Sequence, residues 1–459
     1  IHQVFMVDKS PGYTTPGHQE IELALYRMYK TTGKQKYLDM CEFFLENRGQ
    51  PDNHEAQIFD AAHYAQSHAP IRDQHEAFGH SVRATYLYSG MADLAGEKHD
   101  EALLAACRDL FDDITKKKMY VTGGIGSTNI GEAFTIAYDL PNAHAYTETC
   151  ASIGMMFFGE RMFRIDPEHP SKYHDAVELE MYNGALSGLS LDGECFFYEN
   201  PLEIALEEYG REVGAPVEWR EKLPITERLE VFYCSCCPPN INRFFAELGS
   251  YVLVEDDDGL TVEQYISLNA DTKFGKLTVS EDYAKAGVAK ISSENYSANT
   301  VTLRVPEWAD DITLMLDGKK TEFTVSDGYI CIPVSSSFTI ELDFGIKPRF
   351  VASNPNVRAN VGRIALCYGP LVYCLEKVDN GSRLNQITVS PESVKYAKIE
   401  DDFHGFYSIT LPGYRESKAT LLYLPASDKT DEATSLKFIP YFAFANRGES
   451  DMLVWVRRR

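Results

Sequence analysis

The first half of the chain places hydrophobic residues at helical spacing. The stretch EIELALYRMYKTTG repeats its apolar positions close to the period of an amphipathic helix and reaches a stop at Gly33. KQKYLDMCEFFLENRG follows and stops at Gly49. FGHSVRATYLYSGMADLAG stops at Gly96, before a further helical stretch, DEALLAACRDLFDDITKKK. Another helical pair is predicted over 144–164 and 173–187, so this half is predicted to be helical.

Two of the helical pairs open on the same dipeptide, Gly17-His18 in the first and Gly79-His80 in the second. Repeated helix hairpins bury their apolar faces against their neighbours, as in a solenoid or a closed α-toroid. Equivalent helix starts in a toroid point to the same end, so His18 and His80 are expected to meet at one rim. Such histidines are candidates for binding sugar hydroxyls. The alternative for each is a histidine that caps its helix or is satisfied in the core.

The pattern changes near residue 250, where short runs begin to alternate between apolar and polar residues. TVTLRVPEW and FTIELDF alternate in this way, ITLMLDGKK adds an Asp-Gly turn, and RIALCYGPLVYCLE continues the pattern toward the C-terminus. The chain is therefore predicted to be a multidomain α+β protein. A helical toroid is expected over 1–250 and a β-sandwich over 251–350, with the boundary between 247 and 260. Residues 351–459 are expected to form a second β-sandwich or to continue the first.

The charge composition limits which molecules are expected to bind this protein. The chain has 459 residues, with 44 Lys and Arg against 68 Asp and Glu, and a net charge of −24. Such an acidic surface repels phosphate backbones and anionic lipid, so neither nucleic acid nor a membrane is expected as a partner, and neutral sugars fit better. No apolar run reaches the roughly 18 residues of a membrane span. The chain begins at Ile1 and IHQVF is no signal peptide, so it is expected to start part-way through a gene product.

The cysteines show one unusual cluster. Ten cysteines are ordinary usage for this length, and Cys107 and Cys331 stand in apolar contexts that predict burial. FYCSCCPPN, by contrast, brings Cys234, Cys236 and Cys237 together ahead of two prolines, which stiffen the backbone. Such a loop can present two or three sulfurs to one soft cation, and zinc usually takes four ligands. The alternatives are a closed zinc knot, reactive thiols, or a redox device with a reversible disulfide.

The stretch TETCASIGMMFF offers the missing ligands, Glu148 and Cys150. Residues i and i+2 lie on nearly opposite sides of a regular helix, so both can bind one metal only at a helix start or in irregular backbone. Together with Cys236 and Cys237 they would form a site of three sulfurs and one carboxylate. One thiolate of such a site would stay electron-rich and could act as a nucleophile. On its own, ETC would more often be a first-turn acid and a buried cysteine.

A carboxylate stands in the glycine-rich stretch VTGGIGSTNIGEAF, at Glu132. The glycines allow the backbone to approach a ligand closely, and no Lys-Ser/Thr pair follows them, so the stretch is not a phosphate loop. A lone glutamate in a loop is most often simply solvated.

The combination of ETCASIGMMFF, SLDGECFFYENPLE, CSCCPPNINRF and the terminal IPYFAFANRG resembles glycoside hydrolase family 127, the β-L-arabinofuranosidase family. The resemblance runs from about residue 10 to the C-terminus. It implies an (α/α)6 barrel followed by β-sandwich domains. It also implies a retaining exo-glycosidase that releases terminal β-L-arabinofuranosyl residues from plant glycans with a zinc-bound cysteine nucleophile.

The resemblance assigns roles to particular residues. It implies that Cys236 is the nucleophile and that Glu132 is the general acid/base. His18 and His80 match the family's sugar contacts, and Tyr198 in FFYENPLE matches another. The zinc (Zn2+) ligands that it implies are Glu148, Cys150, Cys236 and Cys237.

One departure and several alternatives remain. Members of the family carry further N-terminal helices, so the barrel is expected to be incomplete at the N-terminus of 1–250. The same chemistry on another unusual furanoside of plant polysaccharides is one alternative function, and a non-catalytic zinc-stapled carbohydrate-binding protein is another. Zinc-bound thiols suit the cytoplasm, or the periplasm if a signal peptide has been removed. The chain could form a homodimer, and the sequence does not decide this. Cys234 has no assigned role.

Overall fold

The computed structural model describes residues 1–10, 13–50, 62–168, 170–208, 225–232, 234–416, 422–423, 425 and 430–459. Packing divides the chain into two compact units. The helical unit is Ile1–Ala185 with Tyr198–Pro201, and the sheet unit is Leu186–Phe197 with Leu202–Arg459. Tyr233, in the cysteine-rich stretch, lies outside the described residues. The mixture of helices and several sheets confirms the predicted multidomain α+β class.

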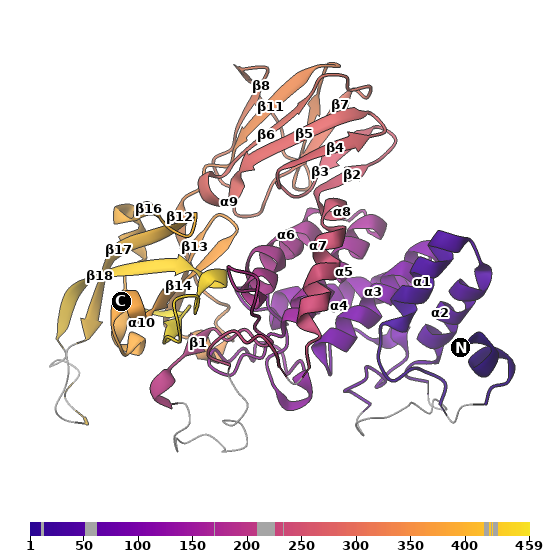
Figure 1. The fold of residues 1–459 in the computed structure, drawn as a ribbon, viewed down its shortest axis with the longest axis horizontal. Helices are drawn as coiled ribbons and strands as arrows, with labels where there is room; N and C mark the ends of the chain where they lie inside the picture. The colour runs from indigo at the N-terminus through magenta and orange to yellow at the C-terminus, as the bar shows by residue number, and fades with distance from the viewer. Residues whose placement is uncertain are drawn as a thin grey trace. The chain divides into compact units, whose positions relative to one another are not determined.

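Antiparallel helical pairs build the helical unit, which runs from indigo to purple in Figure 1. Helices α3 and α5 are neighbours and are buried along most of their length, as expected of helices at the centre of a helical core. The helices are α1 (Ile21–Thr32), α2 (Gln35–Asn47), α3 (Ser81–Lys98), α4 (Glu101–Asp113), α5 (Thr149–Ile165) and α6 (Ser171–Leu179). Single π-helical turns are Gln3–Val7, Ile114–Lys118 and Glu180–Ala185.

Two of the three predicted helix stops, Gly33 and Gly96, behave differently. Helix α1 ends at Gly33, whose φ of 66° is the left-handed conformation that favours glycine. The stop predicted at Gly96 is wrong, because α3 continues to Lys98 and His99 takes the left-handed conformation instead. A Cβ atom on Gly96 would lie 2.6 Å from Cγ2 of Ile165, at the end of α5. Glycine at this position therefore serves close helix packing and does not end the helix.

After the short strand β1 (Glu203–Ile204), the sheet unit continues with helices and then turns to strands. Helix α7 (Cys237–Glu247) and the short α8 (Gly249–Val252) lead directly into strand β2 (Leu253–Glu255). The change from helix to strand thus falls inside the interval 247–260 marked by the sequence pattern. Two more short helices, α9 (Tyr283–Ala286) and α10 (Lys377–Asn380), connect strands further along.

Strands β2 to β11 form two sheets, ordered β10-β7-β3-β2 and β4-β5-β6-β11-β8-β9 (Figure 1). Pairing is antiparallel except between β3 and β7. Alternate residues of β11 are buried, as the period of two predicted, which gives the sheet one dry face. Besides β2, the strands are β3 (Gly259–Val262), β4 (Leu268–Thr272), β5 (Gly275–Asp282), β6 (Val288–Ser293), β7 (Thr300–Arg304), β8 (Thr313–Leu316), β9 (Lys319–Lys320), β10 (Tyr329–Pro333) and β11 (Phe338–Asp343).

Two details of these sheets test the sequence pattern. The predicted Asp-Gly turn is confirmed, since Asp317 and Gly318 both have positive φ between β8 and β9. The predicted burial of Cys331 is wrong, because its neighbours Ile330 and Ile332 take the buried face of β10 and leave the cysteine exposed. In a strand, an apolar neighbourhood in sequence puts alternate residues on the opposite face.

The C-terminal strands form the largest sheet, ordered β1-β19-β14-β18-β17-β15-β20-β13-β12 with β16 beside β17. Strands β13 and β14 are buried on both faces and make its core. Strand β1 pairs with β19, which ties the segment ahead of the cysteine cluster to the end of the chain. The strands are β1 (Glu203–Ile204), β12 (Pro348–Val351), β13 (Arg363–Tyr368), β14 (Leu371–Glu376), β15 (Ile387–Val389), β16 (Lys398–Phe403), β17 (Phe406–Glu416), β18 (Asp431–Pro440), β19 (Met452–Leu453) and β20 (Val456–Arg458).

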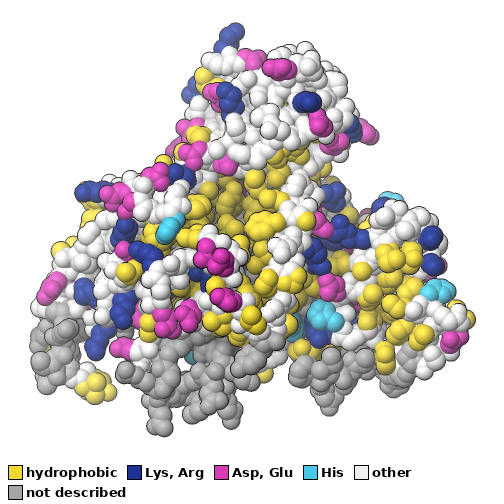
Figure 2. Space-filling view, in the orientation of Figure 1, with side chains coloured by type: hydrophobic (Ala, Val, Ile, Leu, Met, Phe, Trp, Pro, Cys, Tyr) yellow, Lys and Arg dark blue, Asp and Glu magenta, His cyan; other side chains and the backbone are white. Residues whose placement is uncertain are grey.

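The face drawn in Figure 2 carries charged side chains of both signs. On the face drawn in Figure 2, Lys and Arg side chains are scattered among Asp and Glu and do not gather into a basic patch. Within the described part of the chain, no helix combines the length and the apolar character needed to cross a membrane.

Candidate active site and metal centre

The loop that carries Glu132 is fastened to the start of α3. Glu132 ends a 3₁₀ turn, Ile130–Glu132, and has a left-handed φ of 53°, directly after Gly131 with φ 66°. The hydroxyl of Ser81 donates to the backbone carbonyl of Glu132 at 3.1 Å, and the amide of Phe134 donates to the carbonyl of Gly79 at 2.9 Å. A non-glycine residue persists in this conformation only where its surroundings determine it, which is typical of functional loops.

His80 contacts the carboxyl group of Glu132 directly. Its Nε2 lies 2.7 Å from Oε2 of Glu132, and its Nδ1 accepts the amide of Arg83 at 3.5 Å as the N-cap of α3. Because Nδ1 is an acceptor, Nε2 carries the proton and donates it to the carboxylate. His80 therefore takes the capping role considered for it, and it also holds Glu132, a role that the sequence did not indicate.

His18 lies beside His80, with 6.4 Å between the ring centroids, so the structure brings together the histidines of both Gly-His pairs. It does not cap α1, whose N-cap is Glu20. Its Nδ1 lies 3.1 Å from the carbonyl of Gln19. Burial, with the nearby charges of Arg83 and His80, lowers the pKa of His18 to about 4. His18 is therefore a neutral hydrogen-bonding group at neutral pH.

Tyr198 lies on a segment that is hydrogen-bonded to the start of α5. The carbonyl of Tyr198 accepts the amide of Thr149 at 3.0 Å, and the amide of Asn200 donates to the carbonyl of Tyr146 at 3.2 Å. The side-chain amide of Asn200 donates to the carbonyl of Thr147 at 2.8 Å. The ring of Tyr198 is buried and stands 6.1 Å from that of Tyr146. The two segments form one rigid unit at the head of the helix.

Tyr146 is a site residue that sequence reasoning missed. Its hydroxyl is hydrogen-bonded to the carboxyl group of Glu132, and its side chain is buried. Burial raises its pKa far above the usual range, with further contributions from Glu148, Glu132 and Glu199. The only sequence signal is its place two residues ahead of Glu148, which does not separate it from other tyrosines.

Glu199 is a second residue that the sequence did not reveal. Its side chain is only 3% exposed, and its Oε2 has no hydrogen-bond partner in the described part of the chain. Burial, and then the charge of Glu132, raise the pKa of Glu199 to about 9. It directly follows Tyr198, but a glutamate before Asn-Pro carries no distinguishing pattern.

Glu148 and Cys150 stand at a helix start, as their spacing required. Glu148 is the N-cap of α5 and Cys150 lies in its first turn, and both are buried. The ligand atoms of His80, Glu132 and Glu148 all lie within 4.8 Å of one another. The carboxyl group of Glu132 is therefore adjacent to the residue expected to bind metal.

The cysteine pair also stands at a helix start. Cys236 is the N-cap of α7 and Cys237 its first residue, and Pro238 and Pro239 occupy the first turn. Proline is favoured there because its missing N–H would have no partner in any case. The prolines thus begin a helix, whereas the sequence suggested a stiffened loop. The two sulfurs are 3.8 Å apart, and both residues are thiols.

A largely buried cluster of Glu and Cys residues could bind a metal ion. The ligand atoms of its members all lie within 4.8 Å of one another. Zinc–sulfur bonds of about 2.3 Å in a tetrahedron place two sulfurs about 3.8 Å apart, which is the separation of the cysteine pair. The donor set therefore fits zinc, although it does not name the ion. Cys234 is exposed and does not belong to the cluster. The members are Glu148, Cys150, Cys236 and Cys237.

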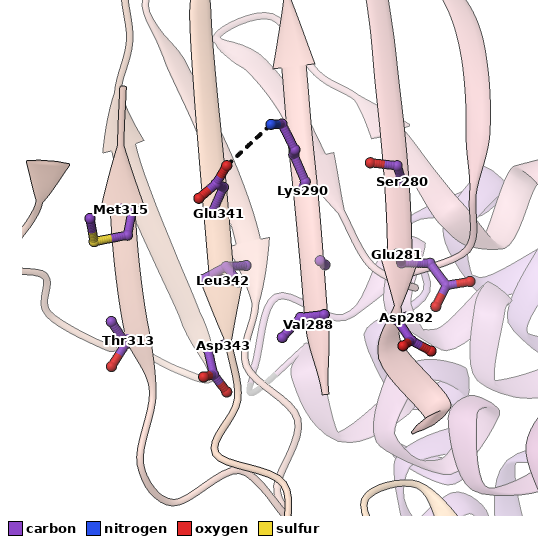
Figure 3. A pocket seen from close by; sticks show the side chains of 11 residues that line it. Ser280, Glu281, Asp282, Val288, Lys290, Thr313, Met315, Glu341, Leu342 and Asp343 are labelled. Atoms are coloured by element: carbon purple, nitrogen blue, oxygen red, sulfur yellow. Dashed lines mark hydrogen bonds and ion pairs between the residues drawn. The ribbon is translucent and has the colours of Figure 1, made fainter. Parts of the chain in front are cut away.

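A separate surface pocket of about 570 Å³ lies on strands β5, β6, β8 and β11 of the sheet unit. Figure 3 shows its acidic lining, including Glu281, Asp282 and Asp343, and the ion pair between Glu341 and Lys290 at 3.1 Å. Its lining contains neither cysteine nor histidine. It therefore lacks the sulfur nucleophile and the histidine that stand near Glu132.

Family models cover nearly the whole chain. Residues 4–250 match the β-L-arabinofuranosidase GH127 catalytic domain, 259–344 match the GH127 middle domain, and 348–457 match the glycoside hydrolase family 127 C-terminal domain. The resemblance seen in the sequence motifs is confirmed by these matches.

Individual relatives and solved structures agree with the family matches. A non-reducing end β-L-arabinofuranosidase of Bifidobacterium longum subsp. longum is 34% identical over 478 residues, covering 96% of this chain and 71% of the relative. The crystal structure of a GH127 β-L-arabinofuranosidase from Geobacillus stearothermophilus T6 has a TM-score of 0.87 at 35% identity, covering 98% of this chain and 74% of that one. A GH127 β-arabinofuranosidase structure has a TM-score of 0.83 at 34% identity, covering 97% and 69%.

Proposed function

Since this chain belongs to glycoside hydrolase family 127 and is a glycoside hydrolase, we propose that it releases terminal β-L-arabinofuranosyl residues from plant glycans with retention of configuration. The similar enzyme of Bifidobacterium longum supports this choice of sugar. The helical pairs α1–α2 and α3–α4 are compatible with an (α/α)6 barrel, the architecture that we propose for the catalytic domain.

One observation carries the proposal: Glu148 belongs to both groups of ligand-type side chains. It is grouped with His80 and Glu132, and also with the cysteines that include Cys236. A proton donor and a sulfur nucleophile therefore flank the same carboxylate. Retaining hydrolysis needs this combination of a positioned acid and a nucleophile around one anomeric carbon.

In the proposed reaction, the thiolate of Cys236 attacks the anomeric carbon while Glu132 gives its proton to the leaving glycosidic oxygen. A glycosyl–cysteine thioether forms and the aglycone leaves as an alcohol. Glu132, now a carboxylate, takes a proton from water, which attacks the anomeric carbon and releases the sugar and the Cys236 thiolate. Two displacements retain the configuration.

The neighbouring side chains position these groups. His80 and Tyr146 hold the carboxyl group of Glu132 from two sides. His18, His80 and Tyr198 are proposed to bind the sugar. Zinc, when bound by Glu148 and the three cysteines of the cluster, would supply a Lewis acid that keeps the thiols ionised and makes the thiolate a better leaving group.

The test is hydrolysis of an aryl β-L-arabinofuranoside by the purified protein, with the anomer of the released sugar followed by NMR. The wild-type protein is expected to release the β-anomer first, and Cys236→Ser and Glu132→Gln are expected to lose turnover by at least about 1,000-fold. Cys234→Ser, outside the cluster, serves as the matched thiol control. Near-normal hydrolysis by Cys236→Ser would remove the nucleophile assignment, and activity on other furanosides alone would remove the choice of sugar.

A further inference from the structure

We propose that Glu199 is a specificity-determining residue, whose carboxyl group binds a hydroxyl of the glycosyl unit held beside Glu132. The inference rests on the proposed function and adds a sugar contact to it. Its basis is the position of a buried carboxyl group whose Oε2 accepts no hydrogen bond within the described part of the chain.

The backbone on both sides of Glu199 is fixed. Tyr198 accepts the amide of Thr149, and Asn200 bonds both to the carbonyl of Tyr146 and, through its side chain, to the hydroxyl of Thr149 at 3.0 Å. Glu199 therefore cannot swing out with a loose loop. Sites that hold a ligand group in one geometry are built on backbone fixed in this manner.

The carboxyl group of Glu199 is a buried acid that interacts with the carboxyl group of Glu132. It is 3% exposed, yet its Oε2 accepts no hydrogen bond from any described residue. The buried Glu160 also has one such oxygen, Oε2, but its other oxygen pairs with Arg164 at 2.5 Å. Both oxygens of the buried Glu180 also lack a partner among the described residues, but Glu180 interacts with no other acid, whereas Glu199 interacts with Glu132. A buried acceptor left unsatisfied by the fold is costly, and a ligand donor removes that cost.

The surroundings of Glu199 restrict what that ligand group can be. The carboxyl group of Glu199 interacts with the charge of Glu132. The buried side chain of Tyr146 interacts with both acids. A second anion would be repelled, and an apolar group would leave the oxygen unsatisfied. A neutral hydroxyl can donate to the carboxyl group and is the functional group that a sugar has in abundance.

The experiment compares hydrolysis of an aryl β-L-arabinofuranoside with that of its 2-, 3- and 5-deoxy analogues. If Glu199 binds one hydroxyl, removing that hydroxyl lowers wild-type kcat/KM by about 10- to 100-fold. Glu199→Leu should lower kcat/KM for the intact substrate by a similar factor and show no further loss with that one analogue, since the paired groups are then both absent.

Glu199→Gln keeps the shape and the hydrogen-bonding capacity of the side chain, and it should retain part of the hydroxyl dependence. Glu160→Gln, the matched control, removes a buried carboxyl group outside the site and should keep every wild-type ratio. Thermal unfolding of all three variants identifies any that fail to fold. If Glu199→Leu does not fold, the ratios of Glu199→Gln decide alone.

The outcomes separate the two proposals. Wild-type activity with unchanged penalties for all three analogues in the Glu199 variants would overturn the sugar contact and leave the proposed function standing. An equal loss on all substrates would assign Glu199 to tuning Glu132, which also overturns the contact. A wild-type protein inactive on every β-L-arabinofuranoside would contradict the proposed function itself, and the sugar contact with it.

Discussion

Nε2 of His80 lies 2.7 Å from Oε2 of Glu132, and the backbones around the two residues are also joined. His80 caps α3, so the position of the helix determines that of the imidazole, and the imidazole determines that of the carboxyl group. The acid/base proposed for the reaction is thus anchored to the helical core, although it stands on a glycine-rich loop.

Replacing His80 by Ala is expected to lower kcat and raise KM, with kcat/KM falling by about 10- to 100-fold, because both the anchor of Glu132 and a sugar contact are lost. Steady-state kinetics on an aryl arabinofuranoside measure both constants. His75→Ala is the control, since His75 is exposed and pairs with the exposed Asp109. Unchanged kcat in His80→Ala would show that the contact with Glu132 does not contribute to turnover.

Replacing Tyr146 by Phe removes one hydroxyl next to Glu132 and leaves the ring in place. The expected result is a fall of about 10-fold in kcat with little change in KM, because the carboxyl group loses a hydrogen-bond partner while the sugar contacts remain. Tyr296→Phe, which removes a buried hydroxyl bonded to the carbonyl of Thr300 in the sheet unit, should keep wild-type kinetics. A change confined to KM would instead place Tyr146 among the sugar contacts.

Replacing Cys237 by Ser is expected to reduce the metal content of the protein together with its activity, because oxygen is a poorer ligand than a thiolate for a zinc-like ion. Zinc per chain, measured by mass spectrometry after gel filtration, is the readout that is independent of turnover. Cys331→Ser is the control, as Cys331 is exposed on β10. Full metal content in Cys237→Ser would remove Cys237 from the ligand set.

The stability of the protein should depend on pH through Glu160. Burial raises the pKa of Glu160 to about 7, despite the opposing charge of Arg164. The folded protein therefore holds this proton more tightly than the unfolded chain. Its contribution to stability is complete below about pH 4.5 and is lost as the pH rises toward 7, by an amount on the order of 3 kcal/mol. His174 also faces the carboxyl group, 3.4 Å away.

Urea unfolding at pH 5 and pH 7.5 measures this dependence. In Glu160→Gln the free energy of unfolding should fall less between the two pH values than in the wild-type protein, because the titrating group is gone. Equal pH dependence in the two proteins would mean that Glu160 does not titrate in this range.

Replacing Gly96 by Ala should destabilise the protein by about 1–3 kcal/mol, although alanine is the better helix former. The added Cβ would meet Ile165 at 2.6 Å. Gly249→Ala is the matched control, since no atom lies within 4 Å of its added Cβ. Ile165→Ala in the Gly96→Ala background should restore part of the loss relative to the two single variants. A neutral Gly96→Ala would show that the helices separate freely here.

The local pattern of the sequence determined much of the fold. Helical spacing and the period of two are local properties of the chain, so α1, α5, β7 and β11 could be predicted from them. The spacing of Glu148 and Cys150 required a helix start, and the structure has one there. The Gly-His pairs indicated that His18 and His80 would meet, since equivalent residues of a repeat take equivalent places.

Tertiary structure alone decided the rest of the site. Cys331 and Gly96 differ from their predictions because strand facing and helix contact depend on partners that the local pattern does not identify. Tyr146 and Glu199 look like ordinary residues in sequence, and they become site candidates only through burial and the charge of Glu132. Burial and electrostatic fields are sums over residues far apart in the chain, so no single stretch of sequence contains them.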